Sequence, residues 1–287
     1  MKPFQYLSPA SMPEAISLLA KYEEEAKVIA GGTDLVVQMR KGSVSPRYVV
    51  DINGIPGLDT MRYDPEEGLT IGALTTLRAL EKSAELQQRY SLIPLAASKL
   101  GSVAIRNVAT VGGNLCNAMP IADTAQALLA LSAKVRIVGP EGDRLISLED
   151  FLVDHGKTSL KTGELLREIH VPVPLPNTKG LYLKHTIRGS IDLAIVNVAV
   201  AITLEPGDRV CKDIRIVLGS VAPTPIRARK AEETVKGKRM DDALIDEAAQ
   251  LASEEAHPRP GSIRASAQYK KEMVRVLAGQ LMREAVV

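Results

Sequence analysis

The chain has 287 residues, enough for about two domains and a sizeable hydrophobic core. Its 36 basic and 34 acidic residues leave a net charge of only +2, which disfavours a nucleic-acid partner, because binding the phosphate backbone requires a concentrated basic face. Aromatic residues make up 3% of the chain, without tryptophan, so a planar ligand would be held by backbone and aliphatic surface, because few rings are available for stacking.

Other classes of protein are disfavoured by what the sequence lacks. No apolar stretch approaches the roughly 20 residues that cross a bilayer. Residues 1–6 lack the apolar part of a secretory signal, so we expect a cytoplasmic protein without a membrane span. Cys116 and Cys211 are too few for a disulfide framework or a cysteine-ligated cluster. The histidines are scattered along the chain, and we expect no metal site.

The first elements in chain order predict a compact α/β unit. Ser11-Met12-Pro13-Glu14 pairs an N-cap serine with a glutamate three residues later, which predicts the start of a helix. Residues 27–30 are typical of a short buried strand, residues 35–40 of a helix and residues 47–52 of another strand. A glycine pair, Gly31-Gly32, stands between the first strand and the second helix.

A second region follows Pro56-Gly57. Its expected strands lie at residues 69–73, 133–138 and 165–171, and its expected helices at residues 75–80, 91–105 and 123–131. The stretch from Arg106 to Leu115 is expected to be irregular, because it contains another glycine pair, Gly112-Gly113. The prolines at 172, 174 and 176 mark the best domain boundary in the chain.

The rest of the chain predicts an antiparallel sheet followed by helices. Large and small residues alternate from Val196 to Leu204, which indicates a half-buried strand, and Ile214 to Leu218 is its expected partner. Helices are expected at residues 227–235, 241–255 and 266–284, where Lys and Arg alternate with Glu on a solvated face. We therefore expect an α+β fold with domains at residues 1–56, 57–176 and 177–287.

The two glycine pairs are the strongest candidates for a binding site. Glycine permits sharp turns and lets a ligand approach the backbone closely. Free main-chain N–H groups at such turns hold phosphate oxygens, at about 1.5–3 kcal/mol for each bond to a charged oxygen. Thr33, Thr110 and Asn114 add polar side chains suited to phosphate or ribityl groups. Asp34 opposes an adjacent phosphate unless its carboxylate points away to cap the helix.

The pairs together favour a dinucleotide ligand, although one Gly-Gly pair alone is more often a plain connector. The Gly-x-Gly-x-x-Gly fingerprint of dinucleotide-binding folds is absent. The residues by themselves do not say which dinucleotide would bind.

Two segments resemble the FAD-binding medium subunit of molybdenum hydroxylases, the family of carbon monoxide dehydrogenase and xanthine dehydrogenase: Ala30–Leu35 (AGGTDL) and Thr110–Leu115 (TVGGNL). Residues 105–109 (IRNVA) and 120–123 (PIAD) fit the same family, and the resemblance covers essentially the whole chain. It implies a two-subdomain FAD-binding fold of the vanillyl-alcohol-oxidase (PCMH) type, followed by a C-terminal domain of a short antiparallel sheet packed on helices.

The resemblance also implies which residues hold the cofactor. Main-chain N–H groups of residues 31–33 would contact the pyrophosphate, Thr110 and Asn114 would reach phosphate or ribityl oxygens, and Leu166 would make an apolar contact. The implied set of cofactor-binding residues is Val28, Ile29, Ala30, Gly31, Gly32, Thr33, Asp34, Leu35, Ala109, Thr110, Gly112, Gly113, Asn114, Asp123, Leu166 and Lys184.

Two members of this set have plain structural alternatives. Asp123 would hydrogen-bond a ribityl hydroxyl, but it also suits the N-cap of its helix. Lys184 would lie near the flavin ring, but a lone lysine is more often a solvated strand residue. The loop from Arg188 to Asp192 would lie near the isoalloxazine. Cys116, beside the second glycine pair, is expected to be a buried unreactive thiol.

The implied function is electron transfer. FAD would accept electrons from iron–sulfur centres and pass them to an external acceptor. The FAD is expected to be noncovalent, because Thr33 stands where relatives with covalently bound FAD carry histidine. Molybdopterin and iron–sulfur clusters would belong to a large and a small partner subunit, in a dimer of heterotrimers. No residue of this chain is expected to be catalytic. The alternatives are a stand-alone flavin oxidase with its own substrate pocket, and a nucleotide-sensing module that has lost redox chemistry.

Overall fold

A computed structural model describes residues 1–189 and 191–286, which group by their internal contacts into two compact units. The first unit comprises Met1–Ala79, Ser102–Asn117 and Ala133–Val173, and the second comprises Leu80–Gly101, Ala118–Ser132 and Pro174–Val287. Each unit is assembled from separate stretches of the chain, so this grouping crosses the expected domain boundary at 56. The change from the first unit to the second at Val173–Pro174 lies within the cluster of prolines at 172, 174 and 176. The three-domain division stays a prediction.

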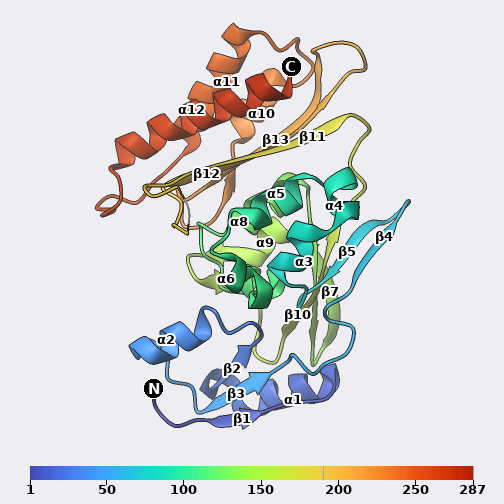
Figure 1. Ribbon diagram of the computed structural model, residues 1–287, viewed down its shortest axis with the longest axis vertical. Coiled ribbons are helices and arrows are strands. Elements are labelled where there is room, and N and C mark those ends of the chain that lie inside the picture. Colours follow the sequence, from blue (N-terminus) through green and yellow to red (C-terminus); the bar gives the residue numbers. More distant parts are fainter. Residues whose placement is uncertain (190, 287) are drawn as a thin grey trace. The chain divides into compact units, whose positions relative to one another are not determined.

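The first unit begins with a small parallel α/β layer (Figure 1). Its sheet has the order β1-β3-β2, and both pairings are parallel. Ser11 caps the first helix by accepting a hydrogen bond from the N–H of Glu14, as the sequence predicted. That helix, α1, packs its buried face against the strands β2 and β3. The elements are β1 (Gln5–Leu7), α1 (Met12–Tyr22), the 3-10 turn η1 (Glu23–Glu25), β2 (Ala26–Ile29), α2 (Leu35–Lys41) and β3 (Tyr48–Asp51).

An antiparallel sheet forms the rest of the first unit, with the strand order β4-β5-β10-β6-β7 and a separate β8-β9 hairpin. The helix α7 packs against β10. The strands are β4 (Met61–Asp64), β5 (Gly68–Gly72), β6 (Lys134–Gly139), β7 (Gly142–Ser147), β8 (Leu152–Asp154), β9 (Lys157–Thr158) and β10 (Leu165–Val171). The helices are α3 (Leu77–Lys82), whose last residues belong to the second unit, α6 (Val103–Val108), α7 (Val111–Cys116) and α9 (Leu148–Phe151).

The prediction of one helix over residues 91–105 is wrong. The chain forms α5 (Leu92–Ser98), breaks, and begins α6 at Val103. Gly101 lies in the break with a φ of 51°, a left-handed conformation that glycine adopts without strain. Ser102 then caps α6 by accepting a hydrogen bond from the N–H of Ile105.

The second unit is built on an antiparallel sheet with the strand order β11-β12-β13-β14. Helices α10, α11 and α12 share an apolar core with this sheet, while α8 packs against β12 and β13, and α5 against β11. The elements are α4 (Ala84–Arg89), α5 as above, α8 (Asp123–Ala130), β11 (Thr178–His185), β12 (Val196–Leu204), β13 (Cys211–Gly219), β14 (Ile226–Arg227), α10 (Arg229–Val235), α11 (Asp242–Glu255) and α12 (Ala267–Ala285).

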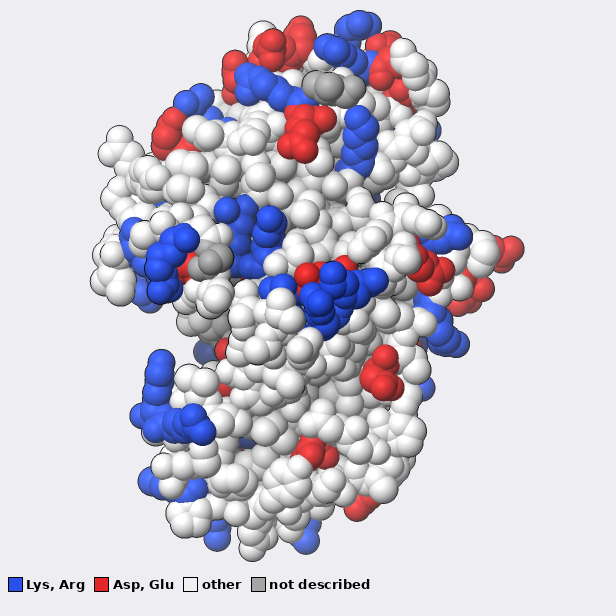
Figure 2. Space-filling view, viewed as in Figure 1, with Lys and Arg blue, Asp and Glu red and all other residues white. Residues whose placement is uncertain are grey.

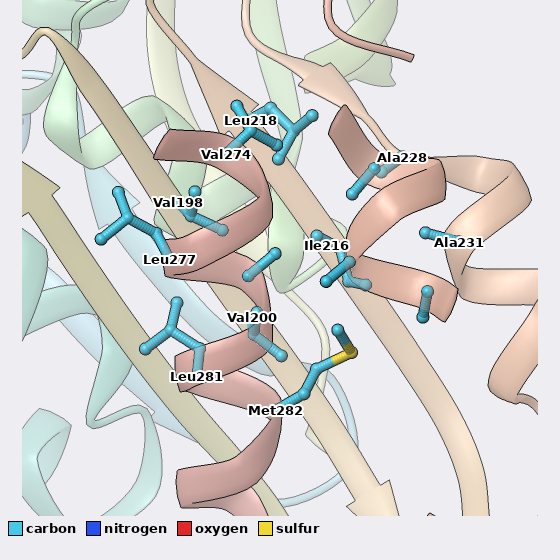
Figure 3. Packing of buried hydrophobic residues seen from close by; sticks show 14 of the residues in the cluster. Val198, Val200, Ile216, Leu218, Ala228, Ala231, Val274, Leu277, Leu281 and Met282 are labelled. Atoms are coloured by element: carbon cyan, nitrogen blue, oxygen red, sulfur yellow. The ribbon is translucent and has the colours of Figure 1, made fainter. Parts of the chain in front are cut away.

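The strand β12 is not half-buried, as its alternation had indicated, because both of its faces are covered. Every residue from Val196 to Thr203 is buried. The large side chains Val198 and Val200 face the C-terminal helices, where they lie with Leu277 of α12 in one apolar cluster (Figure 3). The smaller residues on the other face accommodate α8. Small side chains on a strand therefore mark close packing of a helix here, and not exposure to water.

The outer faces of the C-terminal helices are charged with both signs, as the sequence predicted. Figure 2 shows acidic and basic side chains next to one another over this part of the molecule. Arg283 of α12 pairs with Asp242 and Asp246 of α11, at nitrogen–oxygen distances of 3.1 and 2.6 Å. None of the helices in the described ranges combines the length and the apolar character that crossing a membrane requires.

A matched pair of valines on α12 tests the position of this core. Val274 is fully buried, whereas Val276 is 43% exposed. We expect Val274→Ala to lower the free energy of unfolding by about 1.5–3 kcal/mol, because a buried valine loses its apolar contacts. Val276→Ala should change it by less than about 0.5 kcal/mol. Chemical denaturation followed by circular dichroism measures both values, and equal effects would contradict this packing.

Candidate cofactor site

The first glycine pair forms the turn between β2 and α2. Gly32 reverses the chain with a φ of +69°. The carbonyl before the turn and the carbonyl within it both accept hydrogen bonds from the protein: the N–H of Ile52 donates to Ile29 O at 3.2 Å, and the N–H of Val36 donates to Gly32 O at 3.1 Å. The turn is thus held by its carbonyl groups.

Its amide groups are free. Within residues 1–189 and 191–286, the main-chain N–H groups of Gly31, Gly32 and Thr33 donate no hydrogen bond. These residues are partly exposed, so their amides are not stranded in the core. Consecutive unpaired N–H groups at a glycine turn are the arrangement that binds an anion such as a diphosphate. The first turn therefore fits the phosphate end of a dinucleotide without any lysine or arginine.

Gly31 brings the first turn directly onto the backbone near the second glycine pair. A Cβ atom on Gly31 would lie 2.0 Å from Val108 O and 2.9 Å from Ala109 Cα, both inside contact distance. Only glycine permits this approach. The first turn therefore lies against the backbone just before the second glycine pair, within the first unit.

The second glycine pair does not offer free amides, which corrects the expectation from the sequence. Gly112 and Gly113 lie inside α7 and not in an irregular turn. The N–H of Gly112 donates to Ala73 O at 2.8 Å, and the N–H of Gly113 donates to Thr110 Oγ1 at 3.1 Å. A Cβ on Gly112 would lie 2.6 Å from Ala73 O, so this glycine is needed for close packing. Local helix capping by Thr110 overrides the turn that the glycines suggested.

The Asp34 carboxylate forms a hydrogen bond with Asn117 and does not cap its own helix. Asp34 occupies the N-cap position of α2 but makes no capping hydrogen bond. Partial burial raises the pKa of Asp34, and a hydrogen bond from Asn117, just after α7, opposes that shift. The Asp34 carboxylate is thereby hydrogen-bonded to a residue that follows the second glycine pair. Asp34 thus links the two segments by its side chain, as Gly31 does by its backbone.

The remaining residues of the predicted set fall in both units. Leu166 is 4% exposed on β10, the strand against which α7 packs, so it belongs to the first unit with Val28–Leu35 and Ala109–Asn114. Asp123 and Lys184 belong to the second unit. The structure therefore brings together one group of predicted residues around the glycine turns and another around Asp123.

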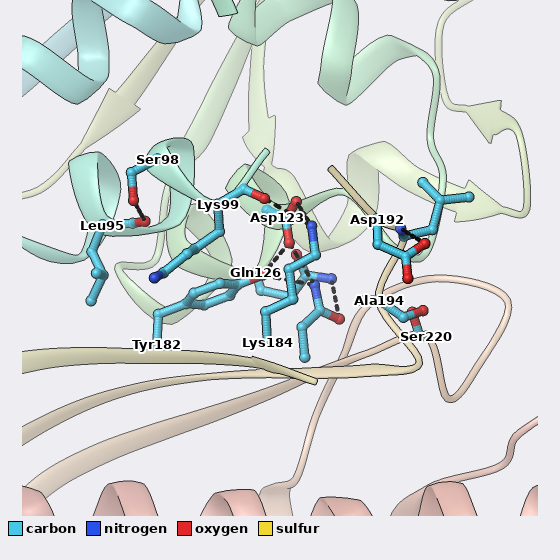
Figure 4. A network of polar contacts seen from close by, with 12 residues as sticks. Leu95, Ser98, Lys99, Asp123, Gln126, Tyr182, Lys184, Asp192, Ala194 and Ser220 are labelled. Atoms are coloured by element: carbon cyan, nitrogen blue, oxygen red, sulfur yellow. Dashed lines mark hydrogen bonds and ion pairs between the residues drawn. The ribbon is translucent and has the colours of Figure 1, made fainter. Parts of the chain in front are cut away.

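Asp123 is the centre of a buried polar network (Figure 4). Lys184 Nζ donates to Asp123 Oδ2 at 2.8 Å and to Lys99 O at 2.9 Å. The Tyr182 hydroxyl donates to Asp123 Oδ1. Asn197 Nδ2 donates to the Tyr182 hydroxyl at 2.9 Å. The network connects α8, β11 and β12, so the ion pair fixes the first residue of α8 against the sheet.

Neither structural alternative for these two residues holds. The N-cap of α8 is Ala122, so Asp123 is not the capping residue. The side chain of Lys184 is 8% exposed, which rules out a solvated strand lysine. Burial raises the pKa of Asp123, and the neighbouring Lys184 ammonium opposes this shift. Burial also raises the pKa of Tyr182, so its hydroxyl remains a proton donor to the carboxylate.

The loop from Arg188 to Asp192 is organised around one carboxylate. Asp192 accepts hydrogen bonds from the N–H groups of Ile187 and Arg188, both at 3.2 Å, and Arg188 Nη2 lies 3.2 Å from its other oxygen. The Arg188 hydrogen bond lowers the pKa of Asp192 to about 2. Ser190, within this loop, lies outside the described residues. Cys116 is partly exposed and not fully buried as expected. Desolvation nevertheless raises the pKa of its thiol to about 12, in line with an unreactive cysteine.

Sequence reasoning missed several residues that shape these sites. Asn53 donates through Nδ2 to Ala30 O at 3.0 Å, at the entrance to the first turn. The pattern Asp-x-Asn at the end of the β3 strand is the local signal for it, because both residue types hydrogen-bond nearby backbone. Tyr182 lies two residues before Lys184, so a strand places both on one face. Asn117 and Asn197 carry no such local signal.

Two known protein families match this chain. The profile described as the FAD binding domain in molybdopterin dehydrogenase matches residues 2–174, and the profile of the CO dehydrogenase flavoprotein C-terminal domain matches residues 182–285. The chain therefore belongs to the family of FAD-binding medium subunits of molybdenum hydroxylases. This membership confirms the predicted fold class, the FAD cofactor and the assignment to flavoprotein oxidoreductase subunits.

Relatives match over nearly their whole length. The xanthine dehydrogenase FAD-binding subunit of Escherichia coli O157:H7 is 31% identical, over 98% of this chain and 95% of that protein. The carbon monoxide dehydrogenase medium chain of Afipia carboxidovorans is 34% identical, over 99% and 95%. The structure of reconstituted CO dehydrogenase from Oligotropha carboxidovorans has a chain that superposes with a TM-score of 0.94 at 31% identity, covering 99% of this chain and 98% of that one.

A methyl group at Gly31 tests the contact between the two segments. Gly31→Ala should push the first turn off the Val108 carbonyl and lower FAD affinity by about tenfold or more, because at least one charge-assisted amide bond is lost. Gly54→Ala is the control, since its Cβ would have only Pro9 O nearby, at 4.0 Å. Titration of the FAD-free protein with FAD measures both, and equal affinities would contradict the assignment.

Removing the buried ammonium tests the network around Asp123. Lys184→Met leaves the carboxylate without its cation and should lower the free energy of unfolding by about 3–5 kcal/mol at neutral pH. The loss should be smaller at acidic pH, because a carboxyl group with a raised pKa favours the folded state when it is protonated. Lys212→Met, on the exposed side of β13, should have little effect. Denaturation at both pH values measures the difference.

Proposed function

We propose that this chain is the FAD-binding electron-transfer subunit of a multi-subunit molybdenum hydroxylase. Family membership over both parts of the chain supports this function. The observation that carries it is the row of unpaired N–H groups at residues 31–33, held at the end of a strand and in contact with the backbone of Val108. Such a turn suits the diphosphate of FAD in a protein whose 3% aromatic content offers few stacking partners.

The residues of the first unit divide the task of holding the cofactor. The amides of residues 31–33 bind the diphosphate, and the hydroxyl of Thr110 and the amide side chain of Asn114 bind phosphate or ribityl oxygens. Gly112 and Gly113 contribute by shape, because their own N–H groups are already paired. The wider set, Val28–Leu35, Ala109 and Leu166, surrounds these groups with backbone and aliphatic surface.

Asp123 and Lys184 are proposed as cofactor contacts on the strength of the family resemblance. Asp123 is assigned to a ribityl hydroxyl and Lys184 to the surroundings of the flavin ring. In this chain the two residues already bind each other, so they reach a ligand as a preformed ion pair. A preformed pair costs little further ordering when a ligand binds.

The division of labour between cofactor and protein follows from these contacts. Bound FAD supplies the redox chemistry, taking electrons from iron–sulfur centres and passing them to an external acceptor. The chain holds the diphosphate with neutral amides, keeps the Asp34 carboxylate turned toward Asn117, and positions the ribityl chain. No covalent link to the flavin is proposed, because Thr33 offers no nucleophilic imidazole.

The partners are a large molybdopterin-binding subunit and a small iron–sulfur subunit, assembled as a dimer of heterotrimers. The names of the relatives, which are medium chains and FAD-binding subunits, support membership of a larger complex. A cytoplasmic location is part of this proposal and rests on the sequence.

Spectroscopy and copurification test the function together. The tagged chain, expressed with its neighbouring genes, should purify with two partners and show the absorption bands of oxidised flavin. Acid precipitation should release the flavin into the supernatant as FAD, because it is bound without a covalent link. A colourless preparation that does not take up added FAD would contradict the proposal, and flavin-dependent turnover by the chain alone would favour a stand-alone oxidase.

A further inference from the structure

The entrance to the first glycine turn is held by an asparagine outside the turn. Asn53, two residues after β3, donates through Nδ2 to Ala30 O at 3.0 Å. Ala30 immediately precedes Gly31, so this bond fixes the peptide group that carries the N–H of Gly31. Asn53 is exposed, which leaves it without a role in the apolar core.

The direction of the Gly31 amide follows from this bond. In a planar trans peptide the C=O and the N–H point in opposite directions, and the described residues contain no cis peptide. Because Ala30 O points toward Asn53, the N–H of Gly31 points away from it. The bond from Val36 to Gly32 O orients the N–H of Thr33 in the same manner. Each hydrogen-bonded carbonyl thus directs the N–H of its own peptide group away from the bonding partner.

Asn53 is itself held in one orientation. Its Nδ2 also donates to Asp51 Oδ1 at 2.7 Å, and its main-chain N–H donates to the same oxygen at 2.9 Å. Two acceptors around Nδ2 define which end of the amide is nitrogen. The Tyr6 hydroxyl donates to the other oxygen of Asp51. Partial burial acts to raise the pKa of Asp51, but the hydrogen bonds from Tyr6 and Asn53 outweigh it and lower this pKa, so the acceptor stays ionised.

We propose that Asn53 is a positioning residue that aims the free amides of the first glycine turn at the diphosphate of FAD, an inference that rests on the proposed function. Asn53 acts through Ala30 and does not touch the cofactor. Asp51 holds Asn53 in place, so the β2 and β3 strands both contribute to the turn at their carboxyl ends.

The test compares side chains with and without the donor at position 53 in the purified complex. FAD is removed and titrated back, and its dissociation constant is read from flavin fluorescence. Asn53→Leu, which is similar in size but lacks the donor, should bind FAD about three- to tenfold more weakly. Asn53→Gln, which keeps the donor, should recover part of the loss. Asn53→Ala provides the same comparison if the leucine variant does not fold.

Two further readouts separate positioning from general damage. The 31P resonances of the bound diphosphate should shift in Asn53→Leu, while the flavin midpoint potential should stay unchanged, because the turn is assigned to the phosphates and not to the ring. Tyr6→Phe is the matched control in the same network. It should alter FAD affinity by less than about twofold, since Asp51 keeps both donors from Asn53.

Each outcome decides between the claims. Wild-type protein that fails to bind FAD would overturn the proposed function. Wild-type protein that binds FAD, with Asn53→Leu binding equally well, would overturn the positioning role alone. An equal loss in Tyr6→Phe, or a shifted potential in Asn53→Leu, would likewise overturn it, because either result would mean a general loosening of the site.

Discussion

The carbonyl oxygen of Val108 lies where the side chain of any residue other than glycine would begin at position 31. This contact joins two segments that are far apart in the sequence and places the first turn against the backbone that precedes α7. The turn can then present amides on its open side, because its carbonyl groups are occupied by Ile52, Val36 and Asn53. The proposed binding of a diphosphate by neutral backbone amides depends on this arrangement.

The two glycine pairs have different physical tasks although they look alike in sequence. The first pair leaves its N–H groups free and makes the close approach to Val108. The second pair lies in a capped helix, with its amides bound to Ala73 and Thr110. Gly112 lets α7 pack closely on Ala73, so the absence of a side chain matters more here than the conformational freedom of glycine. A family motif therefore need not use its repeated residues for one purpose.

In the second unit, a buried polar network connects α8 to the sheet. Asp123, Lys184 and Tyr182 satisfy one another, and Asn197 completes the set from β12. Removing one partner of a buried ion pair lowers the free energy of unfolding far more than an exposed ion pair raises it. This network therefore holds α8 and the sheet together. The small side chains on one face of β12 allow α8 to approach closely enough for these contacts.

Local signals in the sequence determined much of this protein. Ser11 caps its helix as the sequence predicted, and the helices expected from residues 241 and 266 begin directly after the capping residues Asp241 and Ser266, because capping depends on residues within one turn. The glycine motifs indicated the family and the FAD cofactor, because a motif is defined by the order and spacing of residues in the sequence. Only the tertiary structure decided that the first glycine pair alone has free amides, that β12 is buried on both faces, and that Asn53 anchors the turn. Those features depend on partners such as Ala73, α8 and Ala30, which the folded chain brings into contact and which no local pattern specifies.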